Sequence, residues 1–270
     1  MDLLRVFMKG LIIGGTLTVP GVSGGSMALV LGIYSQLIHS FNCIFKKGVE
    51  KREYIKFILI FSLGGGIGIF SISRVILKAM TLYPLLMTFL FAGAVVGGFP
   101  VILREFRGEI FRGSDVVYPL LGVAAVLWIA SLPSNLISMG ANDPLQWLIQ
   151  CLCGVLAAAA LVLPGISVSQ VLYILGLYTI LLKHLAELKL LSLIPFGIGM
   201  VFGILFISRL LEDLMARYHK ESYLLTFGFV VGSVIQLFKE APMGEVNFSC
   251  IFLFFCGFLP IFLISKKRTH

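Results

Sequence analysis

Long runs of apolar residues are the feature that most constrains how this chain can fold. The stretches 120–132 and 251–264 carry no charged residue, and 55–77 carries only Lys56 and Arg74. A helix needs about 20 mostly apolar residues to cross the roughly 30 Å hydrocarbon core of a bilayer. Over the whole chain, 13% of residues are charged, which is about half the share that is usual in soluble domains. We therefore predict an all-α polytopic membrane protein.

The apolar segments fall into two sets, each consisting of a helical hairpin followed by three transmembrane helices. The first set covers residues 1–135, with a hairpin over 4–45 and helices over 55–78, 84–103 and 116–133. The second set covers residues 144–265, with a hairpin over 145–187 and helices over 190–211, 223–239 and 248–265. Residues 266–270 form a basic tail.

Each hairpin contains a Pro-Gly pair that interrupts the helix, Pro20 and Gly21 in the first and Pro164 and Gly165 in the second. In the first hairpin only about 10–12 apolar residues lie on either side of the break, enough to cross half of the bilayer. We therefore predict a re-entrant hairpin, which requires protein or a water-filled cavity around the broken backbone. The second hairpin is longer, and the sequence leaves open whether its arms span fully.

Basic residues lie mostly on one side of the membrane in this arrangement. The N-terminus, the loops 46–56 and 104–112, the segment 209–220 and the tail hold most of the 21 lysines and arginines. The loops 134–144 and 240–247 hold none. Because basic residues collect on the cytoplasmic side, we predict cytoplasmic N- and C-termini. The charges form no single patch, so the net charge of +8 does not indicate nucleic-acid binding.

The two sets repeat each other at two constant offsets. The hairpin offset, which relates Pro20 to Pro164, matches Pro-Gly-Val-Ser at 20–23 with Pro-Gly-Ile-Ser at 164–167, and Leu-Gly-Ile-Tyr at 31–34 with Leu-Gly-Leu-Tyr at 175–178. A second, slightly shorter offset relates Gly68 to Gly203, and we call it the helix offset. It also matches Ile-Ser-Arg at 72–74 with 207–209, Tyr83 with Tyr218, Gly93 with Gly228, Val-Val-Gly at 95–97 with 230–232, and Glu105 with Glu240. Each half makes an odd number of crossings, so we predict inverted repeats, a common plan of secondary transporters.

The polar residues after each Pro-Gly pair are candidates for binding an anion. The start of a helix carries unpaired N–H groups and roughly half a positive charge, which suits phosphate. Glycines let the backbone approach a ligand, and hydroxyl groups donate further hydrogen bonds. The predicted phosphate-binding residues are Ser23, Gly24, Gly25 and Ser26 in the first hairpin and Ser167, Ser169 and Gln170 in the second. The alternative is that Pro-Gly only breaks the helices and the glycines only allow tight packing.

Arg74 and Arg209 are repeat partners inside predicted transmembrane helices, Arg74 toward the outer end and Arg209 toward the inner end. Ionisable residues inside a membrane are costly and are candidates for function, and arginine suits bidentate contact with phosphate. The alternative is that their side chains reach the membrane surface and bind nothing.

Other reactive residues do not form a catalytic pattern. His39 and His184 follow the hairpins and are candidates for proton handling, although histidines at a membrane interface are mostly bystanders. The sequence shows no nucleophile and base pair, no set of metal ligands and no nucleotide-binding motif. We therefore predict neither an enzyme nor a bound metal or cofactor.

The paired hairpin motifs, Pro-Gly-Val-Ser-Gly-Gly-Ser at 20–26 and Pro-Gly-Ile-Ser at 164–167, each followed by Leu-Gly-x-Tyr, resemble the bacterial polyprenyl-phosphate transporter family over nearly the whole chain. The resemblance implies that the protein lies in the bacterial plasma membrane and returns undecaprenyl phosphate, the lipid carrier of cell-wall precursors, from its outer to its inner leaflet. It maps the hairpin motifs of the family onto 20–26 and 164–169.

This chain departs from the family pattern at several positions. Ser26 replaces a threonine, Val168 replaces a glycine, and Ser35 and Thr179 stand where an acidic residue often follows the Gly-x-Tyr element. Coupling to a proton or sodium gradient and the oligomeric state stay open. Two other functions also stay open: a secondary transporter of a small soluble anion, and a membrane-embedded enzyme acting on lipid phosphates, for which a nucleophile with a partner is missing.

Overall fold

The computed structural model describes residues 2–17, 23–45, 50–106, 110, 112–134, 146–178, 180–181, 184, 190–242 and 245–267. Pro20 and Gly21 lie outside this part of the chain, which contains helices and no strands. The helices are α1 (Leu3–Thr16), α2 (Gly24–Val30), α3 (Tyr34–Phe45), α4 (Arg52–Leu82), α5 (Pro84–Gly97), α6 (Phe99–Glu105), η1 (Gly113–Val116), α7 (Val117–Ser131), α8 (Gln146–Val162), α9 (Val168–Ile174), η2 (Leu190–Leu193), α11 (Ile194–Arg217), α12 (His219–Lys239) and α13 (Phe248–Lys267).

Six helical stretches of the described chain are long and apolar enough to cross a membrane: Arg52–Ser71, Pro84–Glu105, Gly113–Ser131, Leu191–Arg217, His219–Lys239 and Phe248–Ser265. One lies at each predicted transmembrane helix. Large apolar side chains also remain exposed on the outer faces, including Phe70 of α4 and Phe206 of α11, at 76% and 69%. Such surfaces suit lipid and not water. The prediction of an all-helical polytopic membrane protein is confirmed.

Two of these helices are longer than predicted. Helix α4 continues to Leu82 and α11 to Arg217, whereas the apolar runs predict ends at 78 and 211. Each helix ends at a tyrosine outside the helical conformation, Tyr83 with φ −136° and ψ 58° and Tyr218 with φ −126° and ψ 60°. These two tyrosines are repeat partners. The backbone conformation, and not the last apolar residue, therefore sets where the two helices end.

The second arm of the first hairpin is itself broken, which the prediction of a hairpin over 4–45 with a single break at Pro20 and Gly21 missed. Helices α2 and α3 meet at an angle of 112°. Gly32 has a φ of +57°, and its N–H group bonds to Leu29 O while Ile33 N bonds to Ala28 O. This pair of hydrogen bonds is a glycine-based helix end. Gly176, its repeat partner, ends α9 in the same way with a φ of +73°.

Glycines let matching helix pairs pack closely in the two halves. A Cβ atom on Gly10 of α1 would overlap the carbonyl oxygen of Phe61 in α4. A Cβ atom on Gly154 of α8 would overlap the carbonyl oxygen of Phe196 in α11. The two glycines are partners at the hairpin offset, and the two phenylalanines are partners at the helix offset. Helix α1 therefore packs on α4 as α8 packs on α11.

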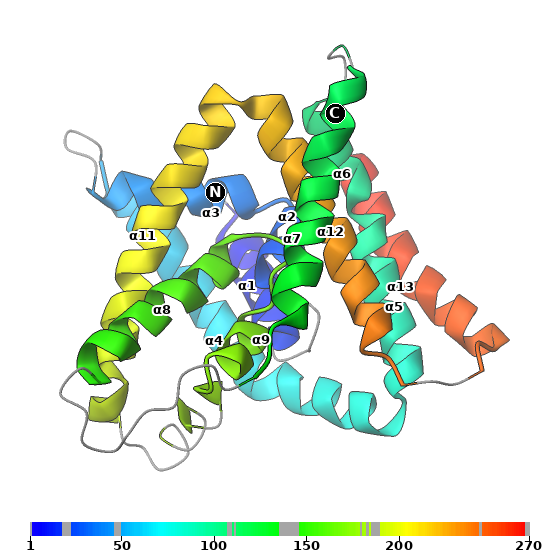
Figure 1. The fold of residues 1–270 in the computed structure, drawn as a ribbon, viewed down its shortest axis with the longest axis horizontal. Coiled ribbons are helices and arrows are strands. Elements are labelled where there is room, and N and C mark those ends of the chain that lie inside the picture. The colour runs from blue at the N-terminus through cyan, green and yellow to red at the C-terminus, as the bar shows by residue number, and fades with distance from the viewer. Residues whose placement is uncertain are drawn as a thin grey trace.

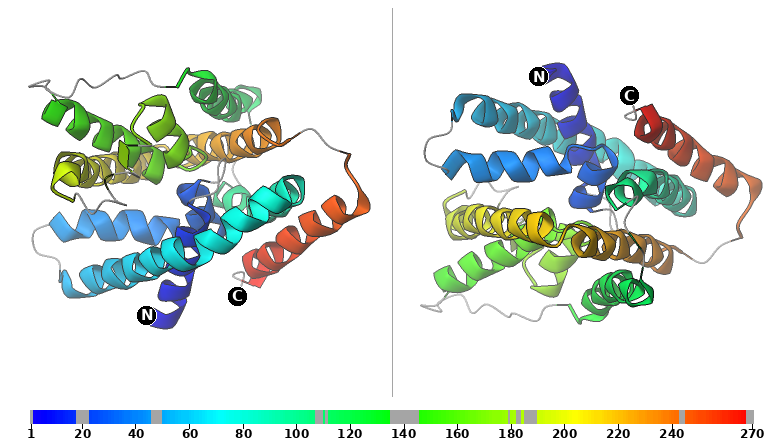
Figure 2. Two further views of the ribbon diagram at one scale, coloured as in Figure 1. Left: turned by 90° about the horizontal axis from the view of Figure 1, so that it is seen from below. Right: turned by 90° about the horizontal axis from the view of Figure 1, so that it is seen from above.

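The last helix of each half packs against the other half. Helix α7 lies along α12, and α13 lies along α5. A Cβ atom on Gly228 would overlap the carbonyl oxygen of Pro119, and one on Gly93 would overlap that of Phe254. The helix offset relates both the two glycines and the two carbonyl residues. Figure 2 shows this exchange, with α13 in red beside the cyan α4 and α5, and α7 on the side of α8 and α12.

Matching turns lie at opposite ends of the molecule. In Figure 1 the turn between α11 and α12 is at the top, and the turn between α4 and α5 is at the bottom. The two tyrosines that form these turns, Tyr218 and Tyr83, are partners at the helix offset. This is the relation that an inverted repeat requires.

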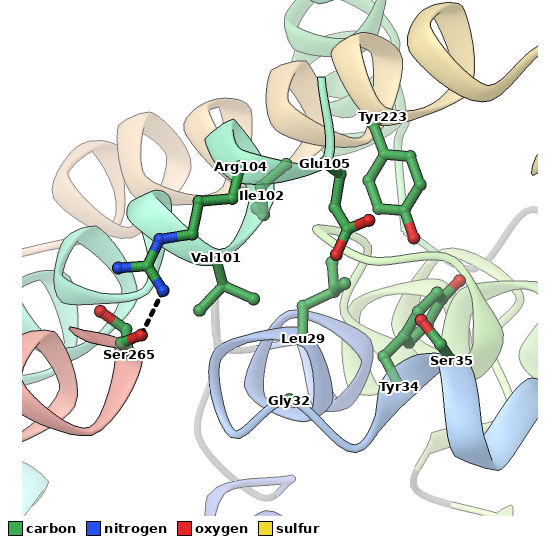
Figure 3. Close-up of a pocket in the computed structure, with 10 residues that line it drawn as sticks. All are labelled: Leu29, Gly32, Tyr34, Ser35, Val101, Ile102, Arg104, Glu105, Tyr223 and Ser265. Atoms are coloured by element: carbon green, nitrogen blue, oxygen red, sulfur yellow. Dashed lines mark hydrogen bonds between the residues drawn. The ribbon is translucent and has the colours of Figure 1, made fainter. Parts of the chain in front are cut away.

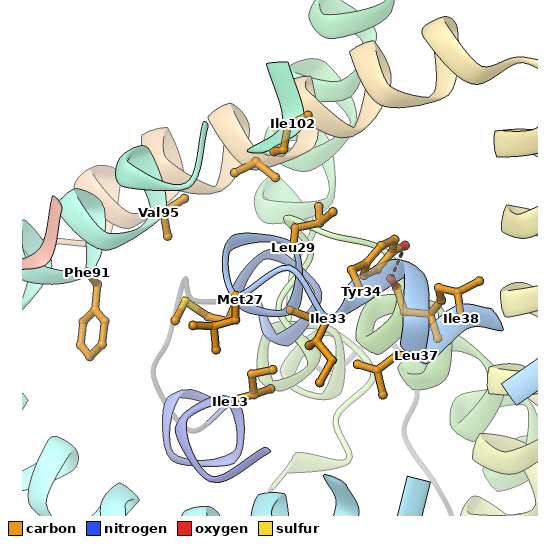
Figure 4. Close-up of a cluster of buried hydrophobic side chains, with 14 of the residues drawn as sticks. Ile13, Met27, Leu29, Ile33, Tyr34, Leu37, Ile38, Phe91, Val95 and Ile102 are labelled. Atoms are coloured by element: carbon orange, nitrogen blue, oxygen red, sulfur yellow. Dashed lines mark hydrogen bonds between the residues drawn. The ribbon is translucent and has the colours of Figure 1, made fainter. Parts of the chain in front are cut away.

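Helix α2 and the turn that follows it lie at the centre of the largest apolar core. All seven residues of α2 are buried. Figure 4 shows Met27, Leu29 and Ile33 among side chains from α1, α3, α5 and α6, including Ile13, Phe91 and Ile102. Short helices at the centre of a bundle leave backbone groups that side chains or a ligand must satisfy, so a binding site is most expected at the hairpins.

Candidate functional site

The two predicted hairpin motifs meet inside the protein. The backbone N–H of Gly165 donates a hydrogen bond of 2.8 Å to Ser26 Oγ. A Cβ atom on Gly25 would lie 3.0 Å from Pro164 Cα, so the two backbones are in direct contact. Ser23 caps α2, its Oγ accepting from Ser26 N at 3.5 Å. We call the contact of 23–26 with 164–165 the hairpin junction.

The second hairpin places its polar residues differently. Ser167 precedes α9, and its Oγ lies 2.9 Å from Ser169 Oγ. Gln170 accepts a hydrogen bond from Gln236 Nε2 of α12. Gly165 has a φ of +85°, and a Cβ atom there would overlap the carbonyl oxygen of Phe229. Only glycine combines this backbone with this space.

The hairpin junction is closed in this conformation. Ser23 is 1% exposed, Ser26 0% and Ser167 2%, and Gly24 and Gly25 are buried. Their hydroxyl groups bond to neighbouring protein atoms. A phosphate group could reach the N–H groups at the start of α2 only after the hairpins move apart. The arrangement brings 23–26 against 164–165, while Ser167, Ser169 and Gln170 make other contacts, and the prediction that these residues bind phosphate stays a prediction.

A pocket of about 230 Å³ lies at the other end of α2. Figure 3 shows its lining, which comes from α2, the Leu-Gly-Ile-Tyr turn, α6, α12 and α13: Leu29, Gly32, Tyr34, Ser35, Val101, Ile102, Arg104, Glu105, Tyr223 and Ser265. Arg104 Nη1 donates to Ser265 O at 2.5 Å. Tyr34 Oη donates to Val162 O at 3.0 Å, tying the pocket wall to the second hairpin.

The acidic residue of this pocket is Glu105. Figure 3 shows its carboxylate turned toward the ring of Tyr223. Its Oε2 lies 3.8 Å from His219 Nε2. The apolar pattern placed Arg104 in a loop, and Glu105 was not among the predicted site residues. The internal repeat could have pointed to Arg104 and Glu105. Glu105 matches Glu240 at the helix offset, and each of these acids follows a basic residue, Arg104 or Lys239.

The predicted arginines are not part of the junction as described. Arg209 is exposed on α11 and does not line the pocket. The backbone of Arg74 lies within α4, and its side chain is outside the described part of the structure. The prediction that both arginines receive a phosphate group stays a prediction.

The two candidate histidines lie in different surroundings. His39 Nδ1 is 2.8 Å from Glu212 Oε1, and the other oxygen of Glu212 accepts from Asn42 Nδ2 at 2.5 Å. Cys43 Sγ lies 3.3 Å from His39 Nε2. These contacts join α3 to α11. His184 is half-buried beside a very small cavity that Gln150 and Ser192 also line.

Metal-ligating residues do not gather in the described ranges, where no group of three or more His, Cys, Asp or Glu side chains could hold an ion. The five cysteines are free thiols. Polar contacts in the described interior include the hairpin junction, Gln236 with Gln170, and Lys220 with the buried Asp115, whereas His39 is exposed at the surface.

Comparisons with known proteins show which family the sequence belongs to. A family model described as undecaprenyl phosphate translocase-like matches residues 13–251. A polyprenyl-phosphate transporter of Vibrio cholerae is 28% identical, covering 92% of this chain and 82% of the relative. A polyprenyl-phosphate transporter of Staphylococcus aureus is 27% identical, covering 93% of this chain and 92% of the relative. No solved structure matches. The chain belongs to the undecaprenyl phosphate translocase-like family.

Proposed function

We propose that this protein moves undecaprenyl phosphate from the outer to the inner leaflet of the bacterial plasma membrane, returning the lipid carrier for another round of cell-envelope synthesis. The observation that carries the proposal is the hairpin junction, where Ser26 and Gly165 join two anion-suited motifs inside a membrane-spanning bundle. The names of both relatives and the family description support the lipid substrate.

The physical task is to carry a charged headgroup through hydrocarbon, where an unpaired charge is very costly. The starts of α2 and α9 offer N–H groups and hydroxyl groups to a phosphate, while the polyprenyl tail stays in the lipid. In this proposal Arg74 and Arg209 attract the headgroup from the two leaflets. Catalysis is not needed for any of these steps.

The proposed mechanism is alternating access between two inverted halves, with both termini in the cytoplasm. The matching turns at opposite ends of the molecule and the matching glycine contacts support the inversion. Opening the junction toward one leaflet and then the other exposes the same groups in turn. A proton or sodium gradient is a candidate driving force, and the contact of His39 with Glu212 is a candidate place for a proton.

The deciding experiment follows labelled undecaprenyl phosphate in proteoliposomes. We expect translocation by the wild-type protein and a fall of at least about tenfold in Arg74→Ala and Arg209→Ala, the loss expected when a charge-assisted contact is removed. Lys78→Ala, which removes an exposed charge from the same helix as Arg74, is the control. Undiminished translocation rates in both arginine variants would contradict the proposal that Arg74 and Arg209 bind the phosphate headgroup. Uptake of a soluble anion with no lipid movement would favour the alternative function, a small-anion transporter.

A further inference from the structure

The two halves carry matching basic-acidic pairs at the ends of matching helices. Arg104 and Glu105 end α6, and their partners at the helix offset, Lys239 and Glu240, lie at the end of α12. Tyr223, which lines the pocket with the first pair, corresponds at the helix offset to Thr88 of α5, and the next residue of α5, Phe89, packs on Phe238 beside the second pair. We call these two places the Arg104 station and the Lys239 station.

The two stations are in different states. The Arg104 station is the pocket of about 230 Å³. At the Lys239 station the buried Gln236 fills the corresponding position, its Nε2 donating to Gln170 Oε1 and, at 2.7 Å, to Glu240 Oε1. Thr88 and its counterpart Tyr223 are both buried, at 3% and 7% exposure, so the two stations differ in the pocket and in the Gln236 hydrogen bonds. One station is therefore open while hydrogen bonds close the other.

The residues at the two stations differ at two pairs of corresponding positions. Gln236 corresponds to Val101, which has no hydrogen-bonding side chain, and Gln170 corresponds to Ser26, whose hydroxyl bonds to Gly165 instead. The first half therefore lacks the two amides that close the second. The asymmetry follows from the side chains.

We propose that the Arg104 and Lys239 stations bind the phosphate headgroup in turn, and that the chain of Gln170, Gln236 and Glu240 is a latch that closes the Lys239 station until a phosphate arrives. This rests on the proposed function. Lys239 is exposed next to the latch and attracts an anion. A phosphate oxygen then accepts the Gln236 amide hydrogens in place of the Glu240 carboxylate. The ligand thus opens the latch by binding the open state better than the closed one.

The first test measures access to the closed station. Thr88→Cys and its counterpart Tyr223→Cys are labelled with a water-soluble thiol reagent in proteoliposomes, with the parent protein and its five cysteines as background. Adding Gln236→Val, which copies Val101, should speed labelling of Thr88→Cys at least about tenfold, because a hydrogen bond to a carboxylate is lost. Tyr223→Cys should be labelled equally fast with and without it. Equally slow labelling of Thr88→Cys in both backgrounds overturns the latch.

The second test identifies the ligand. Undecaprenyl phosphate should speed labelling of Thr88→Cys while Gln236 is intact, and Lys239→Gln should abolish that effect. If the wild-type protein translocates this lipid but labelling responds to neither lipid nor Gln236→Val, the latch is wrong and the proposed function stands. If the protein moves no lipid, but inorganic phosphate and Gln236→Val both speed labelling, the latch stands with a soluble anion as its ligand and the proposed function fails.

Discussion

Ser26 joins the two hairpins through a single hydroxyl group. It is fully buried, caps nothing itself, and accepts the N–H of Gly165 at 2.8 Å. The sequence repeat puts Gln170 at the corresponding place, where the longer side chain reaches α12 instead. Ser26 and Gln170 occupy equivalent positions in the repeat but form hydrogen bonds with different partners. The sequence repeat alone therefore does not describe these contacts.

Replacing Ser26 by alanine should weaken the hairpin junction. The variant leaves the buried N–H of Gly165 without an acceptor, which costs about 1–3 kcal/mol of unfolding free energy. Thermal unfolding in detergent, followed by size-exclusion chromatography, measures the loss. Ser62→Ala, an exposed serine on α4, is the control and should change little. Equal melting temperatures for Ser26→Ala and the wild type would show that the bond contributes nothing.

At the scale of elements, helix pairs are held together by glycines that let backbones touch. Hydrophobic attraction between helices is weak in lipid, so close packing of small residues supplies much of the contact energy. The contact of α5 with α13 depends on Gly93, which faces the carbonyl oxygen of Phe254. By contrast, nothing lies within 4 Å of a Cβ atom placed on Gly66 of α4.

Gly93→Ala and Gly66→Ala therefore form a matched pair of variants. Gly93→Ala should force α5 and α13 apart and cost at least about 1–3 kcal/mol, as overpacking of a tight interface does. Gly66→Ala should be neutral or stabilising by about 0.5–1 kcal/mol, because alanine favours the helix. Melting temperatures of both purified variants give the comparison. A Gly93→Ala protein as stable as Gly66→Ala would contradict the close approach.

At the scale of the whole molecule, the exchange of α7 and α13 interlocks the two halves. The first half supplies α7 to cover α12, and the second supplies α13 to cover α5. The glycine-lined face of α5 is therefore covered by the second half and that of α12 by the first. In the proposed mechanism, this interlock would tie movement at one station to movement at the other, because each moving pair of helices contains one helix of each half.

Separately expressed halves should show this dependence. Residues 1–140 and 141–270 produced together should co-purify through a tag on one of them, because α7 with α12 and α13 with α5 form two interfaces. Each half alone should aggregate, since a glycine-lined face is left uncovered. Pull-down and size-exclusion chromatography are the measurements. Two halves that each purify as stable folded proteins would contradict the interlock.

The membrane-spanning architecture could be predicted from residues read in order. Apolar length identified six spans at the observed places, and the Pro-Gly motifs marked 164–165 as a break in the helix. The glycine-based helix end at Gly32 was readable too, since Leu-Gly-x-Tyr occurs twice, but a continuous apolar run concealed it. These features depend on local backbone preference and local hydrophobicity, which a sequence carries along its length.

The site itself was decided by the tertiary structure. The sequence by itself determined that the chain is helical, membrane-spanning and repeated, because span length and backbone breaks are local properties. Only the fold set Ser26 against Gly165, placed Arg104 and Glu105 in a pocket, and locked Gln236 to Gln170. The two hydrogen bonds among these contacts join residues far apart in the chain. Such pairings depend on which helix faces meet after packing, so the matched motifs alone did not show which partners Ser26 and Gln170 would bond.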